Sequence, residues 1–180
     1  KGNIIAFGGR IFNKDDNAKY QNSPETPIYA KSNVLYGLFQ NSEHIRKSKR
    51  VVLVEGYMDL LQLTQAGISD CLAISGTAFT EGHASILKRY TNNIYVAFDG
   101  DDAGQKASIR CGYILAANLL NPKIITPPNG LDPDDWIRER GKDEFDVAIN
   151  ESEDIIKAHF NYFSKNASQG SLSINEFIQE

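Results

Sequence analysis

Cysteine, histidine and long apolar runs are scarce in this 180-residue sequence, and each shortage argues against a class of protein. There are two cysteines, Cys71 and Cys111, and neither has a second cysteine or a histidine at the spacing of a zinc site. Both lie in apolar runs, so we expect reduced core thiols. No run approaches the roughly 18 apolar residues that span a bilayer, so we expect no contact with a membrane.

The start of the sequence lacks both a signal peptide and an initiating methionine. We therefore expect a cytoplasmic protein, and a segment of a longer chain. A hydrophobic fraction of 41% is ordinary for a globular domain and is enough for a core.

Positive charge is concentrated at the front of the sequence. The net charge is −4, but residues 1–50 carry nine Lys/Arg against four Asp/Glu, whereas residues 51–180 carry ten against nineteen. A basic front end is what a phosphate backbone would meet. The asymmetry therefore predicts a polyanion-binding front and an acidic body.

Residues 1–40 are polar and rich in turns. Apolar residues 4–7 and 10–12 flank Gly8-Gly9, which predicts a hairpin or bulged strand pair there. A short helix is expected within residues 34–45.

From residue 51 the pattern changes to alternating strands and helices. Val51 to Val54 is a short apolar run rich in β-branched residues, typical of a strand buried on both faces. Further strands are expected at 71–74, 94–98 and 123–126, with helices at 57–66, 80–90 and 102–120. This alternation predicts an α/β fold: a parallel sheet with helices on both faces.

The last part of the sequence looks helical, with segments near 143–149, 152–164 and 173–179 and a linker at 168–171. We expect Trp136 to anchor this tail onto the sheet. The predicted domains are a basic α+β piece at 1–40, the α/β domain at 41–142 and a helical appendage at 143–180.

Six carboxylates follow three of the predicted strands. They are Glu55 and Asp59, Asp99 and Asp101, and Asp132 and Asp134. Function in open parallel sheets gathers beyond the carboxyl ends of the strands, so these acids are expected at one edge. Like charges so close need cations, and all-oxygen ligands select Mg²⁺ or Mn²⁺. Such a site suits phosphoryl chemistry.

Each acidic group also has a simpler interpretation. An Asp-Gly-Asp sequence is often a solvated turn, Asp59 can cap a helix, and residues 132–135 can be a helix N-terminus. Only their joint position at one end of one sheet favours a metal site.

Six short segments stand out together in this sequence: Phe7 to Arg10, Lys19 to Thr26, Glu55 to Asp59, Ser75 to Thr80, Asp99 to Gly104 and Gly130 to Asp134. With these segments the sequence resembles the Toprim fold of bacterial DnaG-type primases. The resemblance extends almost continuously from residue 4 to about 145. The Glu-Gly-Tyr-Met-Asp and Asn-Ser-Pro-Glu-Thr strings are specific to primases within the Toprim group. One departure is Asp102 inside the Asp-Gly-Asp motif, which adds an acid to the edge or caps the helix.

The resemblance implies roles for ten residues. Glu55, Asp99 and Asp101 would form the catalytic metal centre, assisted as metal ligands by Asp59, Asp132 and Asp134. Nucleotide phosphates or template would be bound by Arg10, Lys19, Asn22 and Lys31. Taken alone, the three cations would be solvated surface charges, and Asn22 can equally stabilise the Ser-Pro turn.

The resemblance also implies an activity: RNA primer synthesis from ribonucleoside triphosphates on single-stranded DNA, leaving an RNA–DNA hybrid at the bacterial replication fork. The cofactor would be Mg²⁺, with Mn²⁺ as substitute. Zinc would belong to an upstream domain and the replicative helicase to a downstream region, both outside this sequence.

Two alternatives remain. Another Toprim enzyme, a topoisomerase or OLD-type nuclease, shares the acids but not the Asn-Ser-Pro-Glu-Thr string. A non-catalytic metal- or nucleotide-binding module, such as a receiver domain, would carry a lysine after its last strand, whereas Lys123 is expected to open one.

Overall fold

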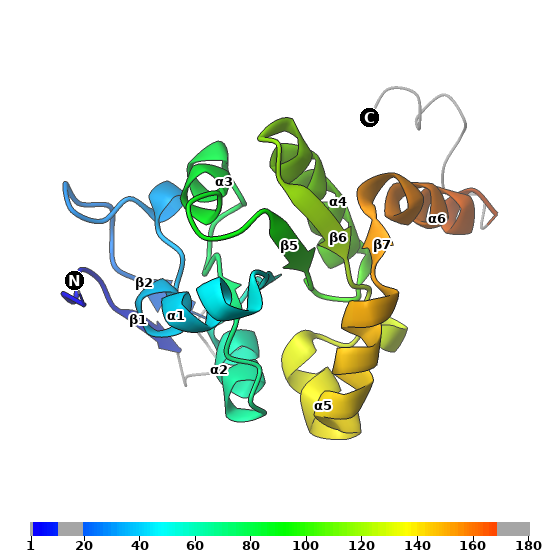
Figure 1. Cartoon of the computed structure of the whole chain (residues 1–180), viewed down its shortest axis with the longest axis horizontal. Coiled ribbons are helices and arrows are strands. Elements are labelled where there is room, and N and C mark those ends of the chain that lie inside the picture. The colour runs from blue at the N-terminus through cyan, green and yellow to red at the C-terminus, as the bar shows by residue number, and fades with distance from the viewer. Residues whose placement is uncertain (1, 11–19, 169–180) are drawn as a thin grey trace.

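A computed structural model describes residues 2–10 and 20–168 (Figure 1). Its centre is a five-stranded sheet in the order β4-β3-β5-β6-β7. The strands are β3 (Val51–Val54), β4 (Cys71–Ala73), β5 (Asn93–Val96), β6 (Asn121–Ile124) and β7 (Glu153–Asp154). The first four are mutually parallel and β7 is antiparallel to β6. The predicted parallel α/β sheet is therefore confirmed, with a short antiparallel edge added.

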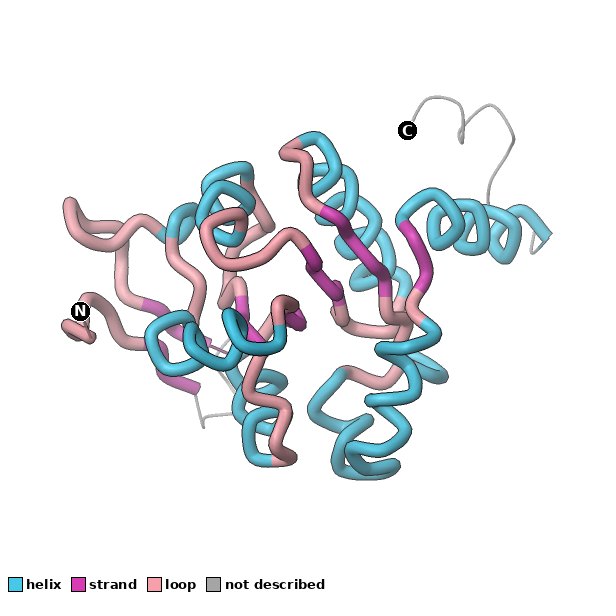
Figure 2. Tube along the Cα trace, viewed as in Figure 1, coloured by secondary structure: helices cyan, strands magenta, loops and turns pink. Residues whose placement is uncertain are grey.

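Helices cover both faces of the sheet, as predicted. They are α1 (Leu38–Ser48), α2 (Tyr57–Gln65), α3 (Glu81–Leu87), α4 (Asp102–Ala117), α5 (Pro133–Glu151) and α6 (Ile155–Ser168), with 3₁₀ turns η1 (Lys31–Asn33) and η2 (Pro128–Gly130). Figure 2 shows the strands running between these helices. None of the helices in the described ranges is both long and apolar enough to cross a membrane.

The alternation of side chains along β3 builds two cores. Val51 and Leu53 pack into a cluster with α1, α3, α4 and α6, whereas Val52 and Val54 pack into a second cluster with α2 and α5. All four β3 side chains are fully buried, as a strand covered on both faces requires. Cys71 and Cys111 are buried free thiols, which confirms that prediction.

The hairpin or bulged strand pair predicted around Gly8-Gly9 is wrong in its placement. Both glycines belong to β1 (Gly8–Arg10), which pairs antiparallel with β2 (Tyr20–Asn22). The predicted partner segment at 10–12 lies mostly outside the described residues. The expected helix within 34–45 begins later, at Leu38, because Gly37 has a left-handed φ of 87°.

Strand β6 begins two residues before its predicted start and includes Pro122. Proline is tolerated because β7 pairs only with Lys123 and Ile124, so no neighbour on that side needs the missing N–H of Pro122. Lys123 therefore lies within the strand instead of opening it. The residues before the strand, Leu119 and Leu120, follow α4 in a turn, so the helix ends earlier than expected.

The tail is attached closely to the sheet. Trp136, Phe145 and Ile149 of α5 are buried in the same cluster as Val52, so Trp136 anchors the tail as expected. Helix α5 runs across the predicted 142/143 boundary, with a non-helical residue at Gly141. Strand β7 was not predicted, because two polar residues give no periodic signal. Ser168 still belongs to α6, so the predicted linker does not begin there, and the expected helix at 173–179 lies outside the described residues.

Candidate functional site

Glu55 and Asp99 meet at the carboxyl edge of the sheet. Glu55 directly follows β3, and Asp99 follows the extension of the neighbouring β5, where the Ala97 amide still donates to Leu53 O at 2.9 Å. Burial first and the charge of Asp99 second raise the pKa of Glu55 to about 7, against a hydrogen bond from the Asp99 backbone amide that lowers it. Asp59 and Asp101 add to the repulsion. The structure thus brings the acids of α2, β3 and the β5–α4 loop together.

Asp59 joins two helix N-termini beneath this edge. Its Oδ2 accepts from the Gly56 amide at 2.9 Å and its Oδ1 accepts from the Asp134 amide at 3.3 Å. The side chain is buried, which raises its pKa to about 6; Asp99 and Asp132 also raise it. Asp59 therefore ties α2 to α5, and its carboxylate lies within electrostatic reach of both neighbouring acidic segments.

Close packing explains the glycines of the Asp-Gly-Asp segment. A Cβ on Gly104 would collide with the carbonyl group of Asp99, and a Cβ on Gly100 would lie 2.9 Å from Leu131 O. Asp101 is the N-cap of α4, since its Oδ1 accepts from the Gly104 amide at 2.7 Å. This leaves its other oxygen for a ligand.

Asp102, offered above as an addition to the acid edge or as a helix cap, is neither. Its side chain is exposed, accepts from the Tyr162 hydroxyl at 2.7 Å and pairs with Lys106 at 3.1 Å. These contacts, that of Tyr162 foremost, lower the pKa of Asp102. The residue connects α4 to α6, and the cap is Asp101.

Asp132 and Asp134 lie at the start of α5. Asp132 caps the helix by accepting from the Asp135 amide at 2.7 Å. Asp134 Oδ1 is buried 2.9 Å from Arg138 Nε but has no partner in hydrogen-bonding geometry. Burial raises the pKa of Asp134, while the charges of Arg138 and Arg10 oppose the shift. Arg10 on β1 therefore faces the acid edge.

The donor chemistry of the edge fits a hard divalent cation. The ligands available are carboxylate oxygens, and Glu55 Oε1 is a buried acceptor without a hydrogen bond among the described residues. No three His, Cys, Asp or Glu side chains in this part of the chain are arranged to hold one ion together. A magnesium ion usually takes one or two carboxylates and completes its shell with water and substrate phosphates. The acids therefore form an open edge instead of an all-protein cage.

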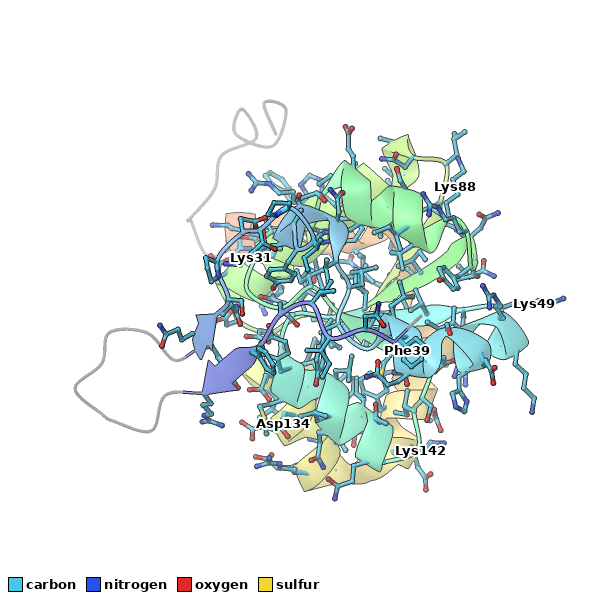
Figure 3. The ribbon with its side chains drawn as sticks, turned by 90° about the vertical axis from the view of Figure 1, so that its left-hand side faces the viewer. Lys31, Phe39, Lys49, Lys88, Asp134 and Lys142 are labelled. Carbon is cyan, nitrogen blue, oxygen red and sulfur yellow. The ribbon has the colours of Figure 1, made fainter. Side chains whose placement is uncertain are left out.

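The predicted phosphate-binding residues have different positions. Lys31 is half-buried in η1, and its backbone amide donates to Glu25 while its carbonyl contacts His83 Nε2 at 2.8 Å. Lys31 and Asp134 lie toward the same side of the molecule in Figure 3. Lys19 lies outside the described residues.

Asn22 makes two contacts that join the β1–β2 hairpin to the acid edge. Its Oδ1 accepts from the Tyr57 hydroxyl at 2.9 Å, and its Nδ2 lies 3.5 Å from Ser75 O. These contacts replace the predicted alternative role in the Ser-Pro turn. The Tyr57 ring also closes on Gly8, where a Cβ would lie 2.8 Å from it.

A cavity of about 730 Å³ opens beside Glu55. Its walls come from residues 77–79, from α4 and from α6, and include Arg110 and Tyr162. No pattern in the sequence indicated Arg110 or Tyr162, because their position at the cavity depends on α6 folding against α4. Arg138 could have been found from its spacing, since it lies four residues after Asp134 on one helix.

Two family models and several curated proteins match this chain. Residues 52–137 match the Toprim-like family, and residues 1–42 match the N-terminal domain of the DNA primase catalytic core. The DNA primase of Listeria monocytogenes is 42% identical over 146 residues, which are 81% of this chain and 23% of the relative. The DNA primase of Halalkalibacterium halodurans is 40% identical over 187 residues, which are 100% of this chain and 31% of the relative.

Solved structures show the same fold. The Aquifex aeolicus primase, a structure of zinc-binding and RNA polymerase domains, superposes with a TM-score of 0.82 at 36% identity, covering 92% of this chain and 41% of that one. The DnaG primase catalytic domain bound to ssDNA superposes with a TM-score of 0.79 at 35% identity, covering 88% of this chain and 50% of that one. The chain spans less than a third of the two curated relatives named above. It belongs to the bacterial DnaG-type DNA primase family and corresponds to part of the catalytic core.

Proposed function

We propose that this chain carries the nucleotidyl-transfer site of a DNA primase, which joins ribonucleoside triphosphates into RNA primers on single-stranded DNA. Glu55, Asp99 and Asp101 are the catalytic metal-binding acids of this proposal, and Asp59, Asp132 and Asp134 assist them. The observation that carries it is the meeting of Glu55 with Asp99, where one buried carboxylate oxygen of Glu55 has no hydrogen-bond partner within residues 2–10 and 20–168. A structural carboxylate would be expected to have its hydrogen bonds satisfied.

The cofactor of the proposed reaction is Mg²⁺, with Mn²⁺ as substitute, and it would supply charge neutralisation at the attacking and leaving oxygens. The chain's own residues fix the position of the acids. The Asp99 amide holds the Glu55 carboxylate, and Gly104 allows the N-terminus of α4 to pack against the Asp99 carbonyl. Asp59 sets the distance between α2 and α5 through its two backbone hydrogen bonds.

The basic residues of the proposal come from the N-terminal part of the sequence. Arg10 acts electrostatically on Asp134, and we propose that its guanidinium binds the phosphates of a triphosphate at the acids. Lys31 and Lys19 are proposed to engage phosphates or the template. The DnaG catalytic domain solved with ssDNA supports a single-stranded template as the partner. Zinc and helicase binding are assigned to regions beyond this chain.

Primer synthesis tests the proposal directly. The complete polypeptide in which this chain occurs is incubated with single-stranded DNA, labelled ribonucleoside triphosphates and Mg²⁺ or Mn²⁺. Template-dependent RNA should form, and Glu55→Gln or Asp99→Asn should reduce it at least about 100-fold, the usual scale for removing a group that stabilises transition-state charge. The matched control is Asp102→Asn, an acid of the same segment that points to α6 and should retain most of the activity.

The opposite result is equally clear. Undiminished synthesis in Glu55→Gln would refute the role of the acid edge. DNA relaxation or cleavage in place of RNA synthesis would favour another Toprim enzyme. Binding of Mn²⁺ and nucleotide without any reaction would favour a non-catalytic module.

A further inference from the structure

The positive charge of residues 1–50 divides between two ends of the molecule. Arg10 acts on Asp134 at the acid edge and Lys31 lies toward the same side in Figure 3, but Arg46, Lys47, Lys49 and Arg50 occupy the end of α1 and the turn before β3. Glu55 follows the last residue of β3, whereas Arg50 precedes the first. Because strands rise about 3.3 Å per residue, the four-residue strand alone separates the two ends by about 13 Å. The expectation that all of the front charge serves the acid edge is therefore incomplete.

A second segment brings more cations to the same end of the sheet. Lys88 and Arg89 follow α3, and this turn is tied to the end of α1. The Arg46 guanidinium lies 4.8 Å from the centre of the Tyr90 ring, and Thr91 Oγ1 donates to Lys49 O at 2.6 Å. Lys49 and Lys88 lie toward one side of Figure 3, and Lys31 and Asp134 toward the other.

We call this surface the basic edge; it consists of Arg46, Lys47, Lys49, Lys88 and Arg89. All five side chains are exposed, and none forms an ion pair with a carboxylate within residues 2–10 and 20–168. Arg50 differs, because it pairs with the buried Asp70 at 2.7 Å. Five unpaired positive charges on one edge of an acidic protein leave a strong local field for an anion.

The surroundings favour a nucleic-acid strand over a protein partner. Protein interfaces are usually anchored by large apolar or aromatic side chains. Within residues 41–50 and 86–93 no large hydrophobic side chain is exposed, and one exposed aliphatic side chain, Leu119, follows Asn118, whose carbonyl accepts from Lys88 Nζ at 3.1 Å. A phosphodiester backbone needs only spaced cations and exposed donors, which the basic edge provides.

We propose that the basic edge binds the phosphodiester backbone of single-stranded nucleic acid, as a second contact at the end of the sheet opposite the acid edge. The strand's identity as template rests on the proposed function; the binding itself does not. A strand held at both ends of the sheet would be retained while nucleotides exchange at the acids.

The test is anisotropy of a fluorescein-labelled 20-nucleotide oligo(dT), titrated with the chain in EDTA over a series of NaCl concentrations. Lys49, Lys88 and Arg89 are changed together to Gln. The control changes Arg140, Lys157 and Lys165 together to Gln, which removes the same charge from exposed positions on α5 and α6. Circular dichroism melting confirms that each variant folds.

The basic-edge variant should bind at least about tenfold more weakly near 0.1 M NaCl. Its plot of log affinity against log salt should be shallower by about two, since each contact with a single strand contributes roughly 0.7 to the slope. The control should keep the slope and lose less than about threefold. Equal losses in both variants, or none in either, would overturn the proposal.

A third variant separates this inference from the proposed function. Glu55→Gln should bind oligo(dT) like the wild type while primer synthesis is lost. If the wild type makes no primers but the basic-edge variant still loses affinity, the proposed function fails and the second contact stands. If primers are made and the basic-edge variant binds oligo(dT) normally, the proposed function stands and the second contact fails.

Discussion

The Tyr57 hydroxyl donates a 2.9 Å hydrogen bond to Asn22 Oδ1, and this bond joins the β1–β2 hairpin to the first turn of α2. The Tyr57 ring also packs edge-on against Tyr36, with centroids 4.8 Å apart. The hairpin carries Arg10, and α2 carries Asp59. The contact therefore sets the basic hairpin relative to the acid edge.

Tyr57→Phe should remove the hydrogen bond to Asn22, while the phenyl ring still fills the space of the tyrosine ring. Losing one partly buried hydrogen bond should lower the unfolding free energy by about 1 kcal/mol, measured by urea denaturation. The KM for nucleotide should rise more than kcat falls, because Arg10 is less well held. Tyr20→Phe is the control, since its ring also contacts Tyr57 but its hydroxyl makes no hydrogen bond within the described ranges. Equal destabilisation of the two variants would contradict this role.

The raised pKa values of Glu55 and Asp59 predict how stability depends on pH. Their folded-state pKa values are about 7 and about 6, against 4.5 and 3.8 for the free groups. Between these values the folded chain binds more protons than the unfolded chain, so the unfolding free energy must fall as pH rises. The stabilisation is complete below about pH 4 and is lost by about pH 7.

Urea midpoints in EDTA at pH 5 and pH 7.5 measure this loss. One pKa unit corresponds to about 1.4 kcal/mol, and partial exposure reduces it, so we expect Glu55 to contribute a decrease of about 1–2 kcal/mol. Glu55→Gln should flatten the decrease. Mg²⁺ should raise the midpoint more at pH 7.5 than at pH 5, where protons compete with it. A midpoint that rises from pH 5 to pH 7.5 in EDTA would show that these acids are not crowded.

The sheet could be predicted because its strands are short, apolar and bounded by turns. The composition of Val51 to Val54 alone predicts a strand that is buried on both faces. Strand β7 could not be predicted, since Glu153 and Asp154 are polar and form a strand only where β6 offers an edge. The hairpin was predicted in the wrong place for a related reason. Gly8-Gly9 looks like a turn in the sequence, but a glycine is needed at position 8 because the Tyr57 ring occupies the space that a side chain would fill.

The acid edge could be predicted because parallel strands bring their carboxyl ends together. The sequence alone left open whether Asp59 binds a ligand or caps a helix, and the structure shows two backbone hydrogen bonds that serve α2 and α5. The sequence also could not separate the roles of Arg10 and Arg46. Both belong to the basic residues 1–50, and only the fold shows that Arg10 acts on Asp134 while Arg46 stacks on Tyr90.

Gly104→Ala should be destabilising although it lies in a helix. Alanine in place of glycine normally stabilises a helix interior by about 1 kcal/mol. Here the new Cβ would collide with the Asp99 carbonyl, so overpacking of about 1–3 kcal/mol should reverse the sign. Gly9→Ala is the control, because its Cβ would only approach Gln21 O at 4.0 Å. Urea denaturation decides; a stabilised Gly104→Ala would mean that α4 can shift away from Asp99 freely.

Substitutions of Arg50 and of its neighbour Lys49 should affect different properties: the first should lower stability and the second should weaken nucleic-acid binding. Arg50 pairs with Asp70, which is buried, so Arg50→Gln leaves an uncompensated charge and should cost about 2–4 kcal/mol of unfolding free energy. Its effect on oligo(dT) affinity should be small, because the charge is already neutralised. Lys49→Gln should do the opposite, since Lys49 has no carboxylate partner among the described residues and lies exposed on the basic edge.

Urea denaturation and anisotropy at matched salt measure both quantities for both variants. Lys106→Gln serves as the reference for an exposed pair, because its partner Asp102 is exposed and such pairs contribute little to stability. If Arg50→Gln loses as much affinity as Lys49→Gln at unchanged stability, then the Asp70 pair does not hold in solution. In that case Arg50 belongs to the basic edge, and the edge extends to the residue that directly precedes β3.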